Sequence, residues 1–198
     1  MIPILYGSLE IAYADANGRL FVDDQGKVLT ETKRLEDYAT LGSGALGDTI
    51  SCTVTEQRNG KYELFMTYPI NGVRFKDIRE GAVIKATPSK GRQPDYFLIY
   101  SITKPLSGII EIRAEHISYQ LSHIPVMPFT ASNCVGALQG LKNNSAEANP
   151  FTFWTDKTTI ATYNQTVPAS LRSRLGGVQG SILDVYGGEF EFDRYDVK

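Results

Sequence analysis

Apolar and polar residues alternate along much of the first half of this chain, at the two-residue period of a β-strand. Residues 50–56 and 62–68 show this pattern on either side of an Asn-Gly turn at residues 58–60, and Pro69 follows the second run. Asn-Gly favours the tight turn of a hairpin, and Pro cannot continue a ladder of hydrogen bonds. The pattern therefore predicts two antiparallel strands. Further strands, separated by Pro or Gly, are predicted at residues 83–86, 96–102 and 108–115.

The start of the chain is also predicted to be β-structure, with shorter patterns. Residues 11–15 and 19–22 flank the Asn-Gly pair at 17–18, which suits a type I′ hairpin turn. The charged residues 30–37 are predicted to be weakly helical. Residues 41–49 are rich in Gly and have little to bury, so we expect a flexible surface loop there.

The second half of the chain changes to a helical period. Apolar residues recur at three-residue steps from Val135 to Leu141, which predicts a helix at residues 134–142 with Ser132 or Asn133 as its N-cap. The remaining predicted elements are a helical turn at 117–122, a strand at 151–155, a helix at 169–175 begun after Pro168, and a short helix at 182–186 capped by Ser181 and ended by Gly187 and Gly188.

The last eleven residues are predicted to start a hairpin without completing it. Residues 189–192 alternate as a strand, 193–196 form a turn, and 197–198 begin a return strand. We therefore expect the chain to be part of a longer protein. The predicted fold class is α+β and mainly β, with a small barrel-like β domain at 1–113, an α+β domain at 114–187, and the start of a further unit at 188–198.

Composition narrows the class of partner. Of the 198 residues, 42% are hydrophobic, which is enough for a real core in one large domain or two small ones. The net charge is −2, so we expect no bulk attraction to nucleic acid or anionic lipid. Residues 1–7 show no classical export signal, and we expect no membrane-spanning segment. Cys52 and Cys134 are isolated, and we expect two buried free thiols.

Two motif matches are better explained as turns and loops. Residues 42–47 read Gly-x-Gly-x-x-Gly, but a dinucleotide site needs a strand before this motif and a helix after it. Neither is predicted here. Asp15 and the turn at 17–18 resemble the opening of a calcium loop, yet the remaining ligands are missing. We therefore predict no cofactor and no bound metal.

The candidate catalytic groups gather around the two histidines, His116 and His123. Glu115 precedes the first, but a metal site would need a third ligand at a recognisable spacing. Ser118 or Cys134 could complete a nucleophile and base pair, although no nucleophile elbow or oxyanion motif surrounds them. Structural histidines near a domain junction are the preferred interpretation, and we predict no catalytic residues.

Two clusters of charged residues can each be interpreted as a binding site or as an ordinary polar surface. Glu189, Glu191 and Asp193 lie on one face of the last predicted strand, where a solvated face is preferred over a paired-carboxylate site. Arg172 and Arg174, beside two glycines, could bind an anion, but the polar end of a helix is the simpler interpretation.

Four blocks of sequence carry a resemblance to a known family. They are residues 51–64 with the Tyr-Pro pair at 68–69, residues 114–121, residues 149–156 and residues 171–193. In content, order and spacing they resemble the N-terminal hub region of phage tail-associated proteins of Gram-positive siphoviruses, the Tal or prophage endopeptidase tail family. The first forty residues match less clearly.

The resemblance implies a baseplate hub similar in fold to the hubs of contractile tails. It implies a homotrimer at the virion tail tip, assembled in the bacterial cytoplasm, that lies below the distal tail protein ring and near the end of the tape-measure protein. Peptidoglycan-cleaving or host-binding modules follow the hub in longer relatives, so no enzyme is expected in this chain. Two alternatives stay open: a peptidoglycan endopeptidase that uses His116 or His123, and a cell-wall carbohydrate-binding module suggested by the many Tyr residues.

Overall fold

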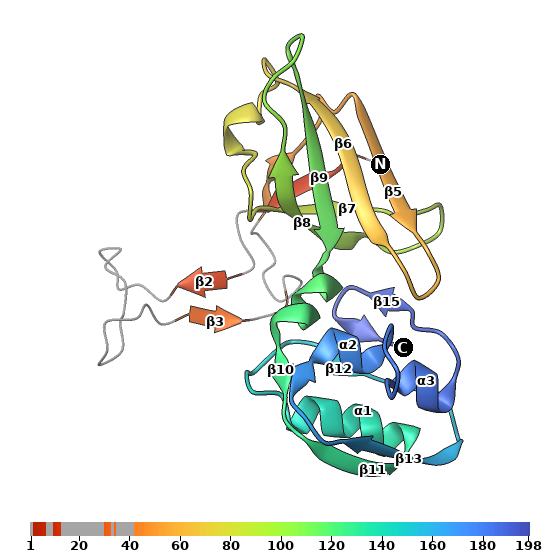
Figure 1. Cartoon of the computed structure of the whole chain (residues 1–198). Helices are drawn as coiled ribbons and strands as arrows, with labels where there is room; N and C mark the ends of the chain where they lie inside the picture. Colours follow the sequence, from red (N-terminus) through yellow and green to blue (C-terminus); the bar gives the residue numbers. More distant parts are fainter. Residues whose placement is uncertain (1, 7–9, 13–29, 33, 35–41) are drawn as a thin grey trace, which may run out of the picture.

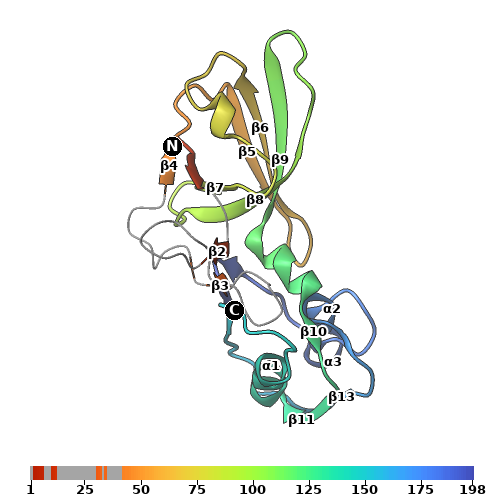
Figure 2. The same ribbon diagram turned by 90° about the vertical axis from the view of Figure 1, so that its left-hand side faces the viewer.

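The computed structural model of the 198-residue chain describes residues 2–6, 10–12, 30–32, 34 and 42–198. A curled β-sheet forms one end of the molecule and a smaller α+β unit forms the other (Figure 1). The chain passes from strand β9, Ile109–His116, through the 3₁₀ helix η3, Ile117–His123, into the second unit. The view turned by 90° shows the same two-part arrangement (Figure 2). The fold is α+β and mainly β, as the sequence predicts.

The first unit is a seven-stranded antiparallel sheet with the order β4-β1-β7-β8-β9-β6-β5. β4 and β5 are its edges and do not pair with each other, so the described sheet is barrel-like without being a closed barrel. The predicted hairpin and the three following strands are confirmed. In sheet order the strands span Gly42–Ala45, Ile4–Tyr6, Val83–Ala86, Asp95–Ile102, Ile109–His116, Tyr62–Pro69 and Ser51–Glu56.

Alternation along β6 and β9 places one row of side chains inside the curl. Phe65 and Arg113, which are paired in the register, lie outside, with the guanidinium over the ring. The inward cross-strand pairs are almost fully buried, and burying apolar area of this kind is the main stabilising contribution to such a sheet. These pairs are Leu64 with Ala114, Met66 with Ile112, and Tyr68 with Ile110.

Residues 42–45 of the loop predicted at 41–49 form a strand, and residues 46–49 form a turn. Gly42–Ala45 is the edge strand β4, antiparallel to β1, and Leu46 is fully buried. The sequence pattern did not predict this strand, because its glycines interrupt the apolar alternation. One of these glycines is required by the packing around it. A Cβ at Gly44, where φ is 134°, would lie 2.5 Å from an Arg74 nitrogen, so the bare backbone makes room for that guanidinium.

The described part of the N-terminal region also differs from the prediction. β2, Glu10–Ala12, pairs antiparallel with β3, Thr30–Thr32, so the latter residues are a strand rather than the start of a weak helix. Cross-strand hydrogen bonds outweigh a weak local preference for helix. The Asn-Gly turn at 17–18 and the calcium-like residue Asp15 lie outside the described residues.

The second unit surrounds helix α1, Cys134–Asn143, whose N-cap is Asn133. The cap side chain accepts a 2.7 Å hydrogen bond from the Gly136 amide, which confirms one of the two predicted caps. Residues Ala137, Leu138 and Leu141 of α1 are buried in the core of this unit. The other elements are η2 Phe75–Asp77 in the first unit and, in the second, β10 Pro125–Val126, β11 Phe129–Asn133, β12 Thr152–Phe153, β13 Ile160–Gln165, β14 Ala169–Ser170, α2 Leu171–Leu175, α3 Ile182–Tyr186, β15 Phe192–Asp193 and β16 Asp196–Val197.

Short elements account for most boundary differences. The predicted helix at 169–175 begins only at Leu171, because Ala169 and Ser170 pair with β10 and the Ser170 side chain caps the helix. The predicted strand at 151–155 is reduced to β12. The helix α3 is confirmed, with Ser181 as its N-cap and Gly187, at φ 68°, as the residue that ends it.

The final hairpin is shorter than predicted and is part of a three-stranded sheet. β15 begins at Phe192 rather than at residue 189, and Arg194, at φ 55°, lies in a tight turn before β16. β16 pairs antiparallel with β15 and parallel with β12, so it is the middle strand of the order β12-β16-β15. Tyr195 and Val197 are buried in the core of the second unit. The domain boundaries inferred from the sequence stay predictions.

Candidate functional site

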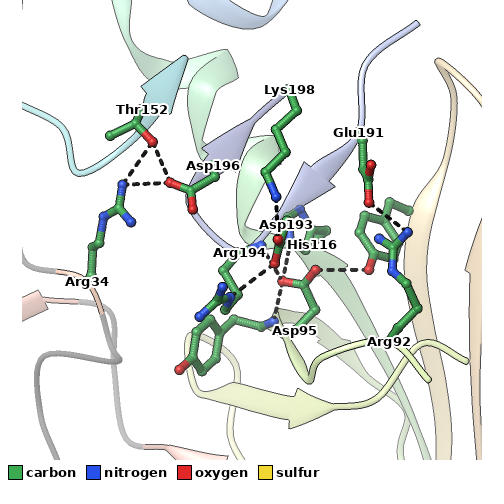
Figure 3. Close-up of polar contacts among 12 residues, drawn as sticks. Arg34, Arg92, Asp95, His116, Thr152, Glu191, Asp193, Arg194, Asp196 and Lys198 are labelled. Atoms are coloured by element: carbon green, nitrogen blue, oxygen red, sulfur yellow. Dashed lines mark hydrogen bonds and ion pairs between the residues drawn. The ribbon is translucent and has the colours of Figure 1, made fainter. Parts of the chain in front are cut away.

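Polar and charged side chains gather where the curled sheet meets the final hairpin (Figure 3). Those from the first unit lie on β8, β9 and the segment before β8, and those from the second lie on or next to β12, β15 and β16. Arg34 reaches the same region from the segment after β3. This region is the interdomain junction. Its centre is Asp95, the first residue of β8, which is 2% exposed.

Asp95 accepts hydrogen bonds from four donors. Its Oδ1 accepts from His116 Nε2 at 2.7 Å, from the Tyr96 amide at 2.9 Å and from the Arg194 amide at 3.1 Å. Its Oδ2 accepts from the Tyr62 hydroxyl at 3.0 Å. A buried carboxylate is tolerated only when its oxygens are satisfied in this way. Because the Arg194 amide belongs to the final hairpin, Asp95 joins the two units directly.

His116 is fully buried and both of its ring nitrogens are engaged. Nδ1 accepts a 3.2 Å hydrogen bond from the Ser118 amide, so the proton of the neutral ring lies on Nε2 and is donated to Asp95. The ring also stacks on Tyr62, with centroids 4.4 Å apart. Neither nitrogen is directed at solvent, and this supports the structural interpretation of the histidine.

The Ser118 hydroxyl is not aligned with His116 as a nucleophile would be. It accepts a 2.9 Å hydrogen bond from Arg172, and only the Ser118 backbone contacts the imidazole. A serine nucleophile needs its hydroxyl hydrogen-bonded to the base. Asp95, His116 and Ser118 therefore resemble a triad in composition but not in geometry.

Tyr62 is the donor at the other carboxylate oxygen. Burial is the largest cause that raises its pKa above the ordinary value, and the nearby Asp95 charge and its hydrogen bond add to the effect. The hydroxyl therefore stays protonated, and able to donate, at neutral pH.

The acidic residues of the final hairpin form ion pairs across the junction. Glu189 pairs with Arg58 of the β5–β6 turn. Glu191 pairs at 2.9 Å with Arg92, which lies three positions before Asp95. Asp193 pairs within the hairpin, with Lys198 at 2.7 Å and Arg194 at 3.1 Å. The prediction of a simply solvated acidic face is therefore incomplete: two of the three carboxylates contact cations of the first unit.

The β5–β6 turn contacts the hairpin segment a second time through Asn59. Its side-chain amide donates to the Gly188 carbonyl at 3.2 Å, and its side-chain oxygen accepts from the Phe190 amide at 2.8 Å. Asn59 has a φ of 50°, a left-handed conformation that Asn tolerates better than most residues. The turn residue therefore has two tasks, closing the hairpin and binding the other unit.

A third contact comes from Arg34. Its guanidinium donates to Asp196 at 2.9 Å, to the Thr152 hydroxyl at 3.1 Å and to the Pro150 carbonyl at 3.1 Å. Thr152 also bonds to the same carboxylate. Burial raises the pKa of Asp196, but the hydrogen bonds from Thr152 and Arg34 outweigh it and leave that pKa below its usual value.

The two candidate anion-binding arginines are both used inside the fold. Arg172 lies 4.1 Å from the ring centroid of Tyr119 and 5.3 Å from that of Phe192, which places its cation between two aromatic rings. Arg174 is 8% exposed and donates to the Val167 carbonyl at 2.5 Å, while its buried Nε has no hydrogen-bond partner among the described residues. These contacts favour packing roles over a surface anion site.

The remaining candidates are not brought together. His123 is exposed at the end of η3, and Cys134 is buried in α1, where burial raises its thiol pKa. Cys52 is partly buried on β5, and burial raises its thiol pKa to about 11, so both thiols stay protonated. Within the described residues no group of His, Cys, Asp and Glu could hold a metal ion. Helices in the described part of the chain are all too short or too polar to cross a membrane.

Sequence reasoning missed Asp95, the centre of the junction. The only signal was a single carboxylate at the start of an otherwise apolar strand, between a proline and an aromatic pair. A charge in that position is ordinary at a strand end that faces solvent. Its burial depends on the final hairpin, about a hundred residues later in the sequence, which no local pattern reveals.

No protein-family profile and no curated protein matches this chain. Among solved structures it is similar to the prophage tail protein gp18 of Listeria monocytogenes EGD-e, with a TM-score of 0.60 and 12% sequence identity. The match covers 100% of this chain and 49% of the Listeria protein, so the chain spans about half the length of that relative. At this identity the likeness is one of fold, and the chain has the fold of a phage tail protein.

Proposed function

We propose that this chain is a structural component of a phage or prophage tail tip. More specifically, it is a baseplate hub that trimerises below the distal tail protein ring and closes or continues the tail tube near the tape-measure protein. The observation that carries the proposal is the structural match to a prophage tail protein, which covers the full length of this chain. The four blocks that resemble tail-associated proteins support it independently.

The junction supports a structural role in physical terms. Asp95, Asn59 and Arg34 each connect segments distant in the sequence, and their polar groups are directed at the protein itself. Such a network holds two units in one orientation, which a ring of identical subunits around a tube requires. The endopeptidase alternative gains no support from His116, because both ring nitrogens are already engaged.

Mass measurement in solution and a pull-down with the distal tail protein test this proposal. We expect a trimer, and we expect the distal tail protein to retain the chain at moderate salt. Asp95→Ala, which breaks the interdomain junction, should weaken retention, whereas Asp77→Ala, which removes a half-exposed carboxylate on η2 that pairs with Arg74, should not. A monomer that the distal tail protein ignores would overturn the hub assignment.

A further inference from the structure

An open cleft of about 460 Å³ lies beside the three-stranded sheet, at the exposed rim of the interdomain junction. Trp154, the only tryptophan of the chain, lies at the cleft and is 62% exposed. A large exposed indole next to a hollow is the usual mark of a binding surface. The other lining residues are Arg58, Asp156, Lys157, Gly188, Glu189, Glu191 and Lys198.

The sheet places three of the lining residues side by side. The Trp154 amide donates to the Val197 carbonyl at 2.9 Å, which continues the pairing of β12 with β16. Lys198 and Glu191 exchange two backbone hydrogen bonds of 2.9 Å, which continues the pairing of β16 with β15. Val197 points into the core, so the alternation of a strand puts Trp154, Lys198 and Glu191 on the opposite face.

Contacts with neighbouring residues hold the charged walls in place. Arg92 pairs with Glu191 at 2.9 Å, Arg58 pairs with Glu189, and Asp193 pairs with Lys198 at 2.7 Å. Side chains already fixed in this way lose little conformational entropy when a ligand binds. These pairs therefore position part of the cleft wall, at Glu189, Glu191 and Lys198, before a ligand binds.

The chemistry of the cleft favours a neutral, hydroxyl-rich ligand. Three cations and three carboxylates line it, so no net charge selects an anion or a cation. Both hydrogen-bond donors and acceptors surround one flat apolar ring. A pyranose has matching parts, since its C–H face can lie on an indole while its hydroxyls donate and accept at the rim. The volume falls in the range of about 300–1,000 Å³ that small-ligand sites occupy.

We propose that this cleft binds a neutral pyranose sugar, with Trp154 as the stacking surface and Glu189, Glu191 and Lys157 as hydrogen-bonding partners. The assignment does not depend on the hub role, because it rests on the cleft alone. Two sources share this chemistry: the N-acetylhexosamine strands of peptidoglycan and hexoses attached to other wall polymers.

The single tryptophan allows a direct test by fluorescence on the whole chain. We expect Trp154 emission to change saturably on titration with the N-acetylglucosamine trimer or with maltotriose, with a dissociation constant in the millimolar range. A response to the first sugar alone indicates a glycan strand, and a response to the second alone indicates a hexose. Absence of a saturable change with both sugars would overturn the proposal.

Variants connect the signal to the cleft. Binding followed by saturation-transfer NMR should disappear in Trp154→Ala and persist in Tyr100→Ala, which removes another exposed aromatic side chain, 46% exposed on β8. Unchanged sugar binding in Trp154→Ala would contradict the assignment. A second result would also contradict it: the distal tail protein shields Trp154 from solvent while neither sugar changes the Trp154 emission. The cleft would then be a protein contact.

Discussion

The two units of this molecule differ in the length of their secondary-structure elements and therefore in how those elements are stabilised. The first is built from long strands: β6, β8 and β9 have eight residues each and bury their inward side chains against one another. In the second, β10, β12, β14, β15 and β16 have two residues each, and α2 and α3 have five. Isolated helices and strands of this length are not stable in water. The second unit therefore depends on tertiary contacts, including those that cross the junction.

We expect the largest effect from removing the carboxylate at the centre of the junction. Asp95→Ala leaves four donors without their acceptor, three of them in buried hydrogen bonds, and should lower the free energy of unfolding by about 3–5 kcal/mol. Chemical denaturation measures this change. The half-exposed carboxylate of Asp77, which pairs with Arg74, is the control, and its removal should cost less than about 1 kcal/mol. Equal effects of the two variants would contradict the central role of Asp95.

Core truncations separate the two units. Ile112→Ala in β9 and Leu138→Ala in α1 each remove a nearly fully buried side chain and should each cost about 2–5 kcal/mol. If the units differ as described, hydrogen exchange will rise mainly in the second unit for Leu138→Ala and in both units for Ile112→Ala. The reason is that the short elements of the second unit depend on contacts with the sheet, whereas the sheet does not depend on them. The opposite pattern of exchange would show that the sheet depends on the second unit.

A smaller effect is expected at the turn that contacts the hairpin segment. Asn59→Gly keeps the left-handed backbone but removes both hydrogen bonds to residues 188 and 190, at a cost of about 1–2 kcal/mol. The Phe190 amide should lose exchange protection, while amides of the β5–β6 ladder keep theirs. Loss of protection in the ladder itself would mean that Asn59 acts on its own hairpin alone.

The smallest effect is the acid sensitivity of the final hairpin. The hydrogen bond from Lys198 is the first cause that lowers the pKa of Asp193, and the pKa of Asp196 is also lowered. A depressed pKa in the folded state means that stability is present above the ordinary carboxylate pKa of about 4 and is lost as the pH falls through the folded value. Denaturation between pH 5 and 2, taken as roughly the span of carboxylate titration, should show this loss. Asp196→Asn should flatten the curve, and an unchanged curve would exclude the contribution of Asp196.

Strands with a long alternating pattern were predictable from their residues. The hairpin at residues 51–69, β7 and β9 lie within one residue of their predicted bounds, because their apolar period and their turns specify the same structure. The capped helices α1 and α3 were predictable for the same reason. By contrast, Gly42–Ala45 has no apolar alternation, and its strand exists because β1 supplies hydrogen-bond partners. The junction was not predictable, since Asp95 meets the Arg194 amide across 99 positions of sequence.

The amino-acid sequence alone determined the mainly β first half, the helix caps and the resemblance to tail proteins, since each of these depends on neighbouring residues or on short motifs. Tertiary structure alone decided that the sheet stays open, that Asp95 and His116 are buried together, and that Trp154 lies beside a cleft. The physical reason is the range of the contacts. Alternation and capping act over a few residues, whereas burial of a charge and formation of a cleft require segments that only folding brings together.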